Sequence, residues 1–313
     1  MGEVIAPPCF ISTPPKVSQE NLMNSMLQPS APLPGSYRSS YSQLGTFYDE
    51  KYQLMWYFMH ASPRPCFSPV LLDEIRHFHG TVVSQNTLSE DRKISYIALA
   101  SDVPGVFNLG GDLNLFRTLI QSKDRNGLLR YTTSCIKALH ANISHLDQDI
   151  TTISLVQGDA LGGGFESALS SNVLIAERSA KMGLPEILFN LFPGMGAYSL
   201  LSRKVGIAHA ERMILSGKIY TADELYDMGV VDILAEDKHG ERAVYDYIQK
   251  EDRAKNGYRA LRKVKDLCSP VTYEELIKVG EIWVDAALRL EARDLRMMER
   301  LVARQSARHQ GAA

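Results

Sequence analysis

Two glutamates in an apolar, glycine-rich stretch are the residues of this chain best suited to chemistry. The stretch 156–198 reads VQGDALGGGFESALSSNVLIAERSAKMGLPEILFNLFPGMGAY. Glu166 falls in the first turn of an expected helix, a place that also suits a structural surface acid. Glu186 follows Leu184–Pro185 and precedes two further apolar residues, so we expect it to be buried. Burial would raise its pKa and suit it to proton transfer near neutral pH.

Two glycine turns are expected to place backbone N–H groups around a ligand. Residues 162–164 are three glycines that follow an apolar strand and open a helical run. The sequence FNLGGDL at 107–113 repeats this pattern, with Asp112 as a helix N-cap. Glycine lets the backbone approach a ligand closely, and the free N–H groups at a helix start favour a negative charge.

The periodicity of the chain indicates an α/β fold wound from repeated units. Strand, glycine turn and helix occur twice in order, about 50 residues apart, which suggests repeated ββα winding. G-x-G-x-x-G after a strand and GxxxxGK[ST] are both absent, so neither of these phosphate-binding turns is indicated. Strands are expected at 47–49, 54–59, 94–100, 150–156 and 230–234, and a loop at 84–93. Helices are expected at 70–83, 113–120, 126–145 and 221–229. Thr221 and Glu224 form an expected capping box at the start of the last of these helices.

Composition divides the chain into three expected regions. Residues 1–44 are expected to be a flexible tail, since half of the 14 prolines lie within the first 36 residues. Residues 45–250 carry the mixed strand and helix signals of a folded core. Residues 251–313 carry almost only helical signals, and their apolar positions suit either a subunit contact or a cap on the same domain.

Overall composition limits the classes of function. Apolar residues make up 45% of the chain, charged residues make up 22%, and the net charge is −2, so no basic surface for nucleic acid or an anionic membrane is expected. The four cysteines are far apart, and the eight histidines form neither H-x-x-x-H nor HExxH, so we expect free thiols and no metal. No signal peptide or apolar run of about 18 residues is present, which favours a cytoplasmic protein. No cofactor is expected. G-x-S-x-G is absent, which disfavours a serine hydrolase.

The glycine and glutamate motifs resemble those of the crotonase superfamily, the enoyl-CoA hydratase/isomerase fold. FNLGGDL, QGDALGGGFE and LPEI with PGMG carry the resemblance, which covers about residues 45–290. It implies a spiral of ββα units followed by C-terminal helices, assembled as a homotrimer or hexamer. It also implies that Glu166 and Glu186 are catalytic and that the amides of Leu109 and Gly163 form an oxyanion hole. Residues implied or expected to contact the substrate are Gly110, Gly162, Gly164, Phe165, Met182, Leu188, Phe189, Phe192 and Met195. Tyr198 and Leu201 are further candidates for the lining of an acyl tunnel. The alternative for the apolar residues among them is a structural place in the core.

Within the superfamily, the residues of these motifs are most similar to those of the synthases of the diffusible signal factor, a cis-2-unsaturated fatty acid. This resemblance implies dehydration of a 3-hydroxyacyl thioester on acyl carrier protein, or on CoA, followed by hydrolysis of the thioester. By analogy with hydratases, Glu186 would serve Cα and Glu166 would serve the hydroxyl group or water. Two alternatives stay open: an enoyl-CoA hydratase/isomerase of fatty acid degradation, and a crotonase that binds a partner such as a sensor histidine kinase.

Overall fold

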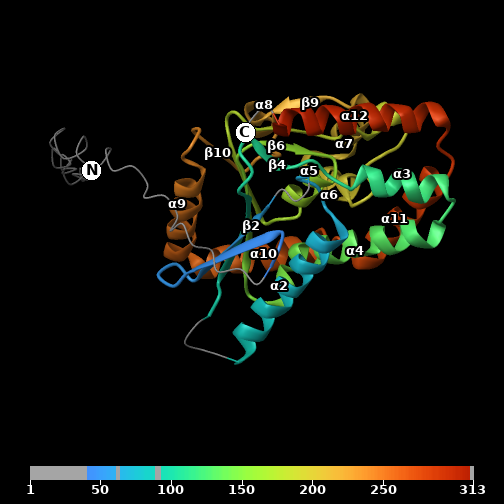
Figure 1. Ribbon diagram of the computed structural model, residues 1–313. Helices are drawn as coiled ribbons and strands as arrows, with labels where there is room; N and C mark the ends of the chain where they lie inside the picture. The colour runs from blue at the N-terminus through green and yellow to red at the C-terminus, as the bar shows by residue number, and fades with distance from the viewer. Residues whose placement is uncertain (1–40, 61–63, 89–92, 311–313) are drawn as a thin grey trace, which may run out of the picture. The chain divides into compact units, whose positions relative to one another are not determined.

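Two β-sheets form the framework of the protein (Figure 1). Within residues 41–60, 64–88 and 93–310, which the computed structural model describes, one sheet has six strands in the order β1-β2-β3-β5-β7-β10 and the other has four in the order β4-β6-β8-β9. The strands are β1 (Leu44–Asp49), β2 (Leu54–Met59), β3 (Tyr96–Ser101), β4 (Val106–Asn108), β5 (Thr151–Val156), β6 (Asp159–Leu161), β7 (Val173–Glu177), β8 (Lys181–Gly183), β9 (Ile219–Thr221) and β10 (Ile233–Ala235). The expected tail over 1–44 lies almost entirely outside the described residues.

Successive strand pairs build both sheets at once. The pairs β3–β4, β5–β6 and β7–β8 each give their first strand to the larger sheet and their second to the smaller one. A helical segment follows each pair: α3 (Leu113–Gln121), α5 (Gly163–Leu169) and the short η2 (Pro185–Phe189). Neighbouring strands from successive pairs are parallel, and β5 and β7 are buried along their whole length, as inner strands of a parallel sheet usually are. The predicted ββα winding is confirmed.

Local capping signals define several helix starts. The Asp112 carboxylate accepts from the amides of Asn114 and Leu115 at the start of α3, and Thr221 with Glu224 forms a complete capping box, so both predictions are confirmed. The predicted loop at 84–93 is partly wrong, because α2 continues to residue 88. The remaining helices are α2 (Pro69–Leu88), α4 (Arg125–Ile143), η1 (His145–Asp147), α6 (Ala197–Val205), α7 (Ile207–Ser216), α8 (Ala222–Asp227), α9 (Gly240–Arg253), α10 (Lys255–Cys268), α11 (Tyr273–Ala287) and α12 (Ala292–Gln310).

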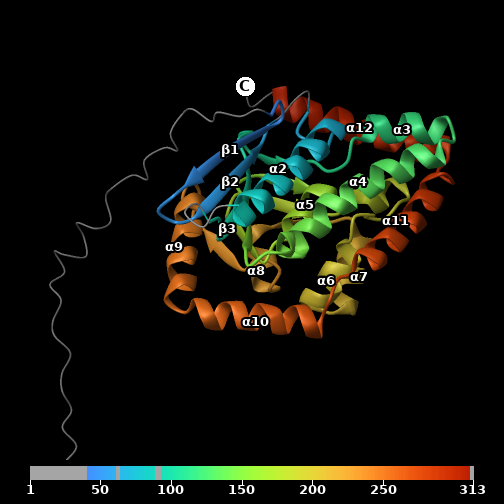
Figure 2. The same cartoon turned by 90° about the horizontal axis from the view of Figure 1, so that it is seen from below.

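The C-terminal helices fold back onto the core of the same chain. Helix α11 packs along α4, and α12 packs along α3 and touches η2 (Figure 2). Trp283 and Val284 on α11 are buried, and so is Met298 on α12. Contacts among the elements place these helices in one compact unit with the spiral. Of the two alternatives for this region, a cap on its own domain is therefore present in this chain.

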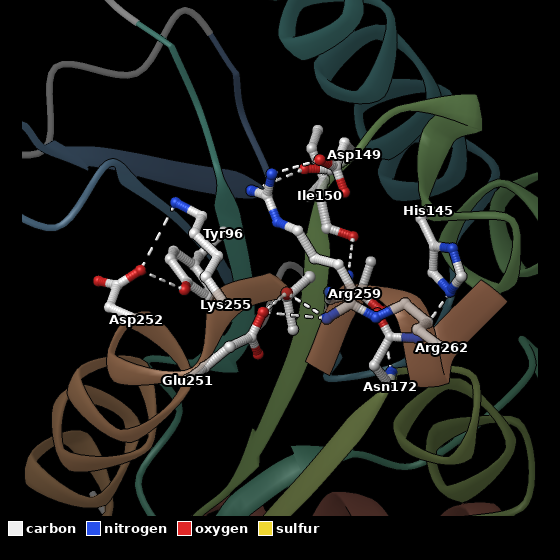
Figure 3. A network of polar contacts seen from close by, with 12 residues as sticks. Tyr96, His145, Asp149, Ile150, Asn172, Glu251, Asp252, Lys255, Arg259 and Arg262 are labelled. Atoms are coloured by element: carbon white, nitrogen blue, oxygen red, sulfur yellow. Dashed lines mark hydrogen bonds and ion pairs between the residues drawn. The ribbon is translucent and has the colours of Figure 1, made fainter. Parts of the chain in front are cut away.

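A buried polar network fixes α9 and α10 to the start of β5 (Figure 3). Glu251 is fully buried, and its Oε1 atom accepts from Arg262 Nη2 at 3.1 Å and from the Thr151 hydroxyl at 2.7 Å. The Tyr247 hydroxyl donates to the other carboxylate oxygen at 2.7 Å. Because each oxygen of this buried charge has a hydrogen-bond donor, the ion pair is fully satisfied.

Among the described residues, no helix is both long enough and apolar enough to cross a membrane. Cys66, Cys135 and Cys268 are free thiols, as expected, and Cys9 lies outside the described residues. Within the same part of the chain, no three His, Cys, Asp or Glu side chains converge in a way that would hold a metal ion.

Candidate active site

A cavity lies where three parallel strands of the smaller sheet end. Strand β6 pairs with β4 through Val106 and Asn108, and with β8 through Met182 and Gly183. Because these strands run in the same direction, the segments that follow them meet at one edge of the sheet. The segments are the first glycine turn after β4, the three glycines after β6 and the Glu186 segment after β8. The topology thus brings together motifs that are up to about 75 residues apart in sequence.

The cavity has a volume of about 490 Å³ and a mostly apolar wall. Both predicted catalytic glutamates line it, together with Gly110 and Gly111 of the first turn and Gly162 and Gly163 of the second. Side chains from α3, α4, α11 and α12 close the rest of the wall, so the C-terminal helices contribute directly to the site. This size and lining suit an acyl group with a few polar contacts at its reactive end. The apolar lining includes Val106, Leu113, Phe116, Leu161, Leu188, Phe189, Leu191, Met195, Trp283 and Leu301, and the polar lining includes Tyr131, Thr132, Cys135 and Asp159.

Glu166 belongs to α5, and its carboxyl group is buried against the start of α6. The residue is 1% exposed, and its Oε1 atom accepts from the amides of Met195 at 2.8 Å and Ala197 at 2.9 Å. Burial raises the pKa of Glu166 to about 7, and the backbone amides of residues 195–197 hold it below the value that burial alone would give. The alternative of a surface acid is therefore wrong. The carboxyl group can exist in either protonation state near neutral pH.

Glu186 presents a carboxyl oxygen without a hydrogen-bond partner. The residue as a whole is partly exposed, but its Oε2 atom is buried and no described residue bonds to it. Burial, and then the charge of Glu166, raise the pKa of Glu186 to about 8. Gly162 leaves room for this carboxyl group, because a Cβ atom there would lie 2.5 Å from Glu186 Oε1. An orphaned buried carboxyl oxygen of this kind is available to exchange a proton with a ligand.

Two backbone amides without acceptors lie next to each other at the glycine turns. Gly163 is the first residue of α5, so its N–H has no partner within the helix, and none is present elsewhere in the described residues. The Gly111 amide likewise has no acceptor in the described part of the chain. A Cβ atom on Gly163 would lie 3.6 Å from the Gly111 nitrogen, and one on Gly110 would lie 3.0 Å from the Gly163 nitrogen. The turns are therefore in contact at their amides.

The structure corrects the expectation for Leu109. Its amide donates to the Pro65 carbonyl at 2.8 Å, so this N–H is already paired. The next amide, that of Gly110, donates to Asn108 Oδ1 at 2.8 Å. Gly110 has a φ of +92°, which interrupts the regular backbone pairing after β4. Gly111, rather than Leu109, presents an unpaired N–H beside Gly163.

The predicted substrate-contacting residues divide into two groups. Gly110, Gly162, Leu188, Phe189 and Met195 line the cavity. The other six do not line it. Gly164 faces the backbone of β4, where a Cβ atom would lie 2.0 Å from the Asn108 oxygen. Phe165, Met182 and Leu201 are fully buried in the core, Phe192 packs against that core, and Tyr198 is 42% exposed. For the four core-packing apolar residues, the alternative of a structural role is the correct one.

The inner wall of the cavity was not identified from the sequence. Phe116 on α3 and Trp283 on α11 meet edge to face, with ring centroids 4.9 Å apart. Gly194 lies directly under the Trp283 ring, since a Cβ atom there would be 2.4 Å from it. The available signals were the glycines themselves, Gly111 and Gly194, which leave no space for a side chain against these aromatic rings. They gave no indication of which ring each glycine would meet.

Known proteins of one family match this chain in sequence. The family model described as enoyl-CoA hydratase/isomerase matches residues 78–282, which is more than half of the chain. Methylglutaconyl-CoA hydratase of Rattus norvegicus is 33% identical over 159 residues, covering 50% of this chain and 48% of the relative. Probable enoyl-CoA hydratase 2 of Arabidopsis thaliana is 36% identical over 149 residues, covering 47% and 46%. The chain thus spans about half the length of these curated relatives.

Solved structures share the fold over most of their length. An enoyl-CoA hydratase from Bacillus halodurans superposes with a TM-score of 0.69 at 20% identity, covering 82% of this chain and 99% of the other. Pseudomonas aeruginosa DspI superposes with a TM-score of 0.59 at 22% identity, covering 75% and 92%. At these identities the likeness concerns the fold. With its two-sheet ββα spiral and the family match over residues 78–282, this chain belongs to the enoyl-CoA hydratase/isomerase family of the crotonase superfamily.

Proposed function

We propose that the protein dehydrates a 3-hydroxyacyl thioester and hydrolyses the resulting 2-enoyl thioester, releasing a cis-2-unsaturated fatty acid. The observation that carries the proposal is the convergence of four groups on one cavity: the carboxyl groups of Glu166 and Glu186 and the unpaired amides of Gly111 and Gly163. The similarity of the glycine and glutamate motifs to those of signal-factor synthases supports the choice of product.

Dehydration uses all four groups. The Glu186 carboxylate removes a proton from Cα, and the electron pair moves onto the thioester carbonyl as an enolate. The Gly111 and Gly163 amides donate to the enolate oxygen, and one such donor contributes roughly 3 kcal/mol to the transition state. The enolate then collapses to the Cα–Cβ double bond. The departing 3-hydroxyl group takes a proton from the Glu166 carboxylic acid and leaves as water.

Hydrolysis uses the same amides. A glutamate carboxylate takes a proton from water as the water oxygen attacks the thioester carbonyl carbon. The oxyanion of the tetrahedral intermediate occupies the position of the former enolate oxygen, so the same two donors stabilise it. Its collapse releases the carboxylic acid and expels the thiolate, which recovers a proton from the glutamate. A single site therefore supports both steps without a second nucleophile.

The rest of the cavity suits the hydrocarbon part of an acyl thioester. Phe116, Leu191 and Trp283 contribute large apolar side chains to the wall of the cavity. Burial of each methylene group of an acyl chain against such a wall contributes about 0.8 kcal/mol. We therefore propose a substrate with an extended alkyl chain, carried on acyl carrier protein or CoA.

Hydration of a 2-enoyl thioester is the second candidate, and the family match over residues 78–282 favours it. Burial raises the pKa of both glutamates, so either carboxyl group can hold a proton near neutral pH. Hydration uses the proton on Glu186, which passes to Cα while Glu166 activates water. Dehydration uses the opposite arrangement, with the proton on Glu166.

Product analysis separates the two functions. The full chain is incubated separately with 3-hydroxydodecanoyl carrier protein and with trans-2-dodecenoyl-CoA, and both free acids and thioesters are resolved by chromatography. We expect free cis-2-dodecenoic acid from the first substrate. Formation of 3-hydroxyacyl-CoA from the second substrate alone would establish the hydratase instead, and free 3-hydroxy acid alone would show a thioesterase without dehydration.

Matched variants connect the product to the site. Glu186→Gln and Glu166→Gln should each abolish double-bond formation while the variants still bind a saturated acyl thioester. Glu50→Gln, at an exposed turn position, is the control and should retain full activity. Full dehydration by a folded Glu186→Gln variant would refute the assigned chemistry.

A further inference from the structure

The first glycine turn is attached to a neighbouring segment, residues 64–68, by an incomplete backbone ladder. The Leu109 amide donates to the Pro65 carbonyl at 2.8 Å, and the Phe67 amide donates to the Gly110 carbonyl at 2.8 Å. Gly111 and Phe67 form an isolated parallel bridge. In a regular parallel ladder, the Asp112 amide would complete this pairing by donating to the Phe67 carbonyl. Here a side chain occupies that position.

The hydroxyl group of Tyr131 bridges the gap in this ladder. It donates to the Phe67 carbonyl at 2.5 Å and accepts from the Asp112 amide at 3.1 Å. Tyr131 comes from α4, is 7% exposed and lines the catalytic cavity. Its ring also packs edge to face against Phe116, with centroids 5.0 Å apart. The hydroxyl group thus connects α4 to both strands of the ladder.

The position of this bridge matters for the Gly111 amide. Gly111 lies between Gly110, whose carbonyl is held by Phe67, and Asp112, whose amide is held by Tyr131. The Phe116 ring packs against Gly111 itself, since a Cβ atom there would lie 2.5 Å from that ring. Both neighbours of Gly111 are therefore fixed, and the direction of its own unpaired N–H is determined by them.

We infer that Tyr131 is a positioning residue that aims the Gly111 amide at the thioester oxygen. The inference rests on the proposed function, because it assigns a role within the same oxyanion hole. Without the hydroxyl group, the Asp112 amide and the Phe67 carbonyl lose their shared partner in a mostly buried place, and the turn can relax to find others. A donor that relaxes away from its productive position stabilises the transition state less, although the substrate still enters the cavity.

Tyr131→Phe is the direct test, because it removes the hydroxyl group and keeps the ring. Loss of a whole oxyanion donor lowers kcat by about 10²–10³-fold, so a displaced donor should lower it by about 10–100-fold, with KM changed less than about threefold. Tyr96→Phe is the matched control. Tyr96 is also buried, and its hydroxyl donates to Asp252 Oδ1 at 2.8 Å, on the part of the fold shown in Figure 3. This control should retain the wild-type kcat.

A spectroscopic measurement reports the donor itself. The carbonyl stretching frequency of a bound, 13C-labelled saturated acyl thioester falls when amides donate to its oxygen. We expect wild type and Tyr96→Phe to lower it equally relative to the free thioester, and Tyr131→Phe to lower it less. If Tyr131→Phe does not fold, replacement of Tyr131 by p-aminophenylalanine keeps a donor to the Phe67 carbonyl and should preserve most of the shift.

The outcomes distinguish this inference from the function on which it rests. A wild-type protein that leaves the carbonyl frequency unchanged would overturn the oxyanion hole itself. A wild-type shift that Tyr131→Phe reproduces in full, with an unchanged kcat, would overturn only the role of Tyr131. An equal loss of kcat in Tyr96→Phe would show that any buried hydroxyl deletion has this effect, and would also overturn the inference.

Discussion

Replacing the Glu186 carboxyl group by an amide should make the ligand-free protein more stable at alkaline pH while it destroys activity. Burial raises the pKa of Glu186 from 4.5 to about 8, so the folded protein binds this proton more tightly than the unfolded chain does. A carboxyl group with a raised pKa favours the folded state below its unfolded pKa, and this contribution is lost as the pH rises towards the folded value. Glutamine cannot ionise, so the Glu186→Gln variant avoids this loss.

The size of the effect follows from the shift. A change from 4.5 to about 8 corresponds to an upper limit of about 5 kcal/mol in the free energy of unfolding. We therefore expect the two proteins to be about equally stable near pH 4.5. The variant should then gain relative stability up to about pH 8, with a constant difference above that.

Urea unfolding at a series of pH values and one fixed protein concentration measures this difference. Titrations of groups remote from Glu186 cancel, whereas that of Glu166, whose charge contributes to the shift, is part of the measured difference. Glu50→Gln at an exposed position shows what the same substitution does without burial. A difference between wild type and Glu186→Gln that stays constant from pH 4 to pH 9 would refute the buried, unpartnered state of this carboxyl group. A wild type that gains relative stability as the pH rises would refute it as well.

Two further substitutions test the site and the fold separately. Gly162→Ala should lower kcat by at least about 10²-fold. The new Cβ atom would lie 2.5 Å from Glu186 Oε1 and push this carboxyl group out of place, and the φ of +52° disfavours any side chain. Full activity of the variant would contradict this packing. Arg262→Met should lower the free energy of unfolding by about 3–5 kcal/mol, because it leaves the Glu251 charge buried without its cation. The folded fraction of Arg262→Met should keep the wild-type kcat, because this network lies outside the cavity. A stability equal to that of wild type in a denaturant titration would count against the ion pair.

Local sequence signals predicted the elements that carry the chemistry. The Asp112 cap, the Thr221 capping box and the glycine-led start of α5 depend on neighbours within a few residues, so their geometry is contained in the motif itself. The recurring strand, glycine turn and helix likewise predicted the winding of the two sheets. The expected burial of Glu186 applies to its Oε2 atom, although the residue as a whole is partly exposed.

Features that depend on distant partners were not predictable in the same way. The Leu109 amide is paired with Pro65, which is 44 residues earlier, and no pattern around residues 107–113 reveals this partner. Phe165 and Met182 face the core rather than the cavity because of the register between the sheets and helices. Trp283 reaches the cavity only because α11 folds back along α4, which is a tertiary contact.

A crystal structure of the protein with a bound saturated acyl thioester would show whether the four groups surround the reacting atoms. We expect the thioester oxygen about 2.7–3.1 Å from both the Gly111 and the Gly163 nitrogens. The carboxyl groups of Glu166 and Glu186 should face the two adjacent carbons of the acyl chain. A thioester oxygen bound away from these two amides, or reacting carbons out of reach of the two carboxyl groups, would rule out the proposed chemistry.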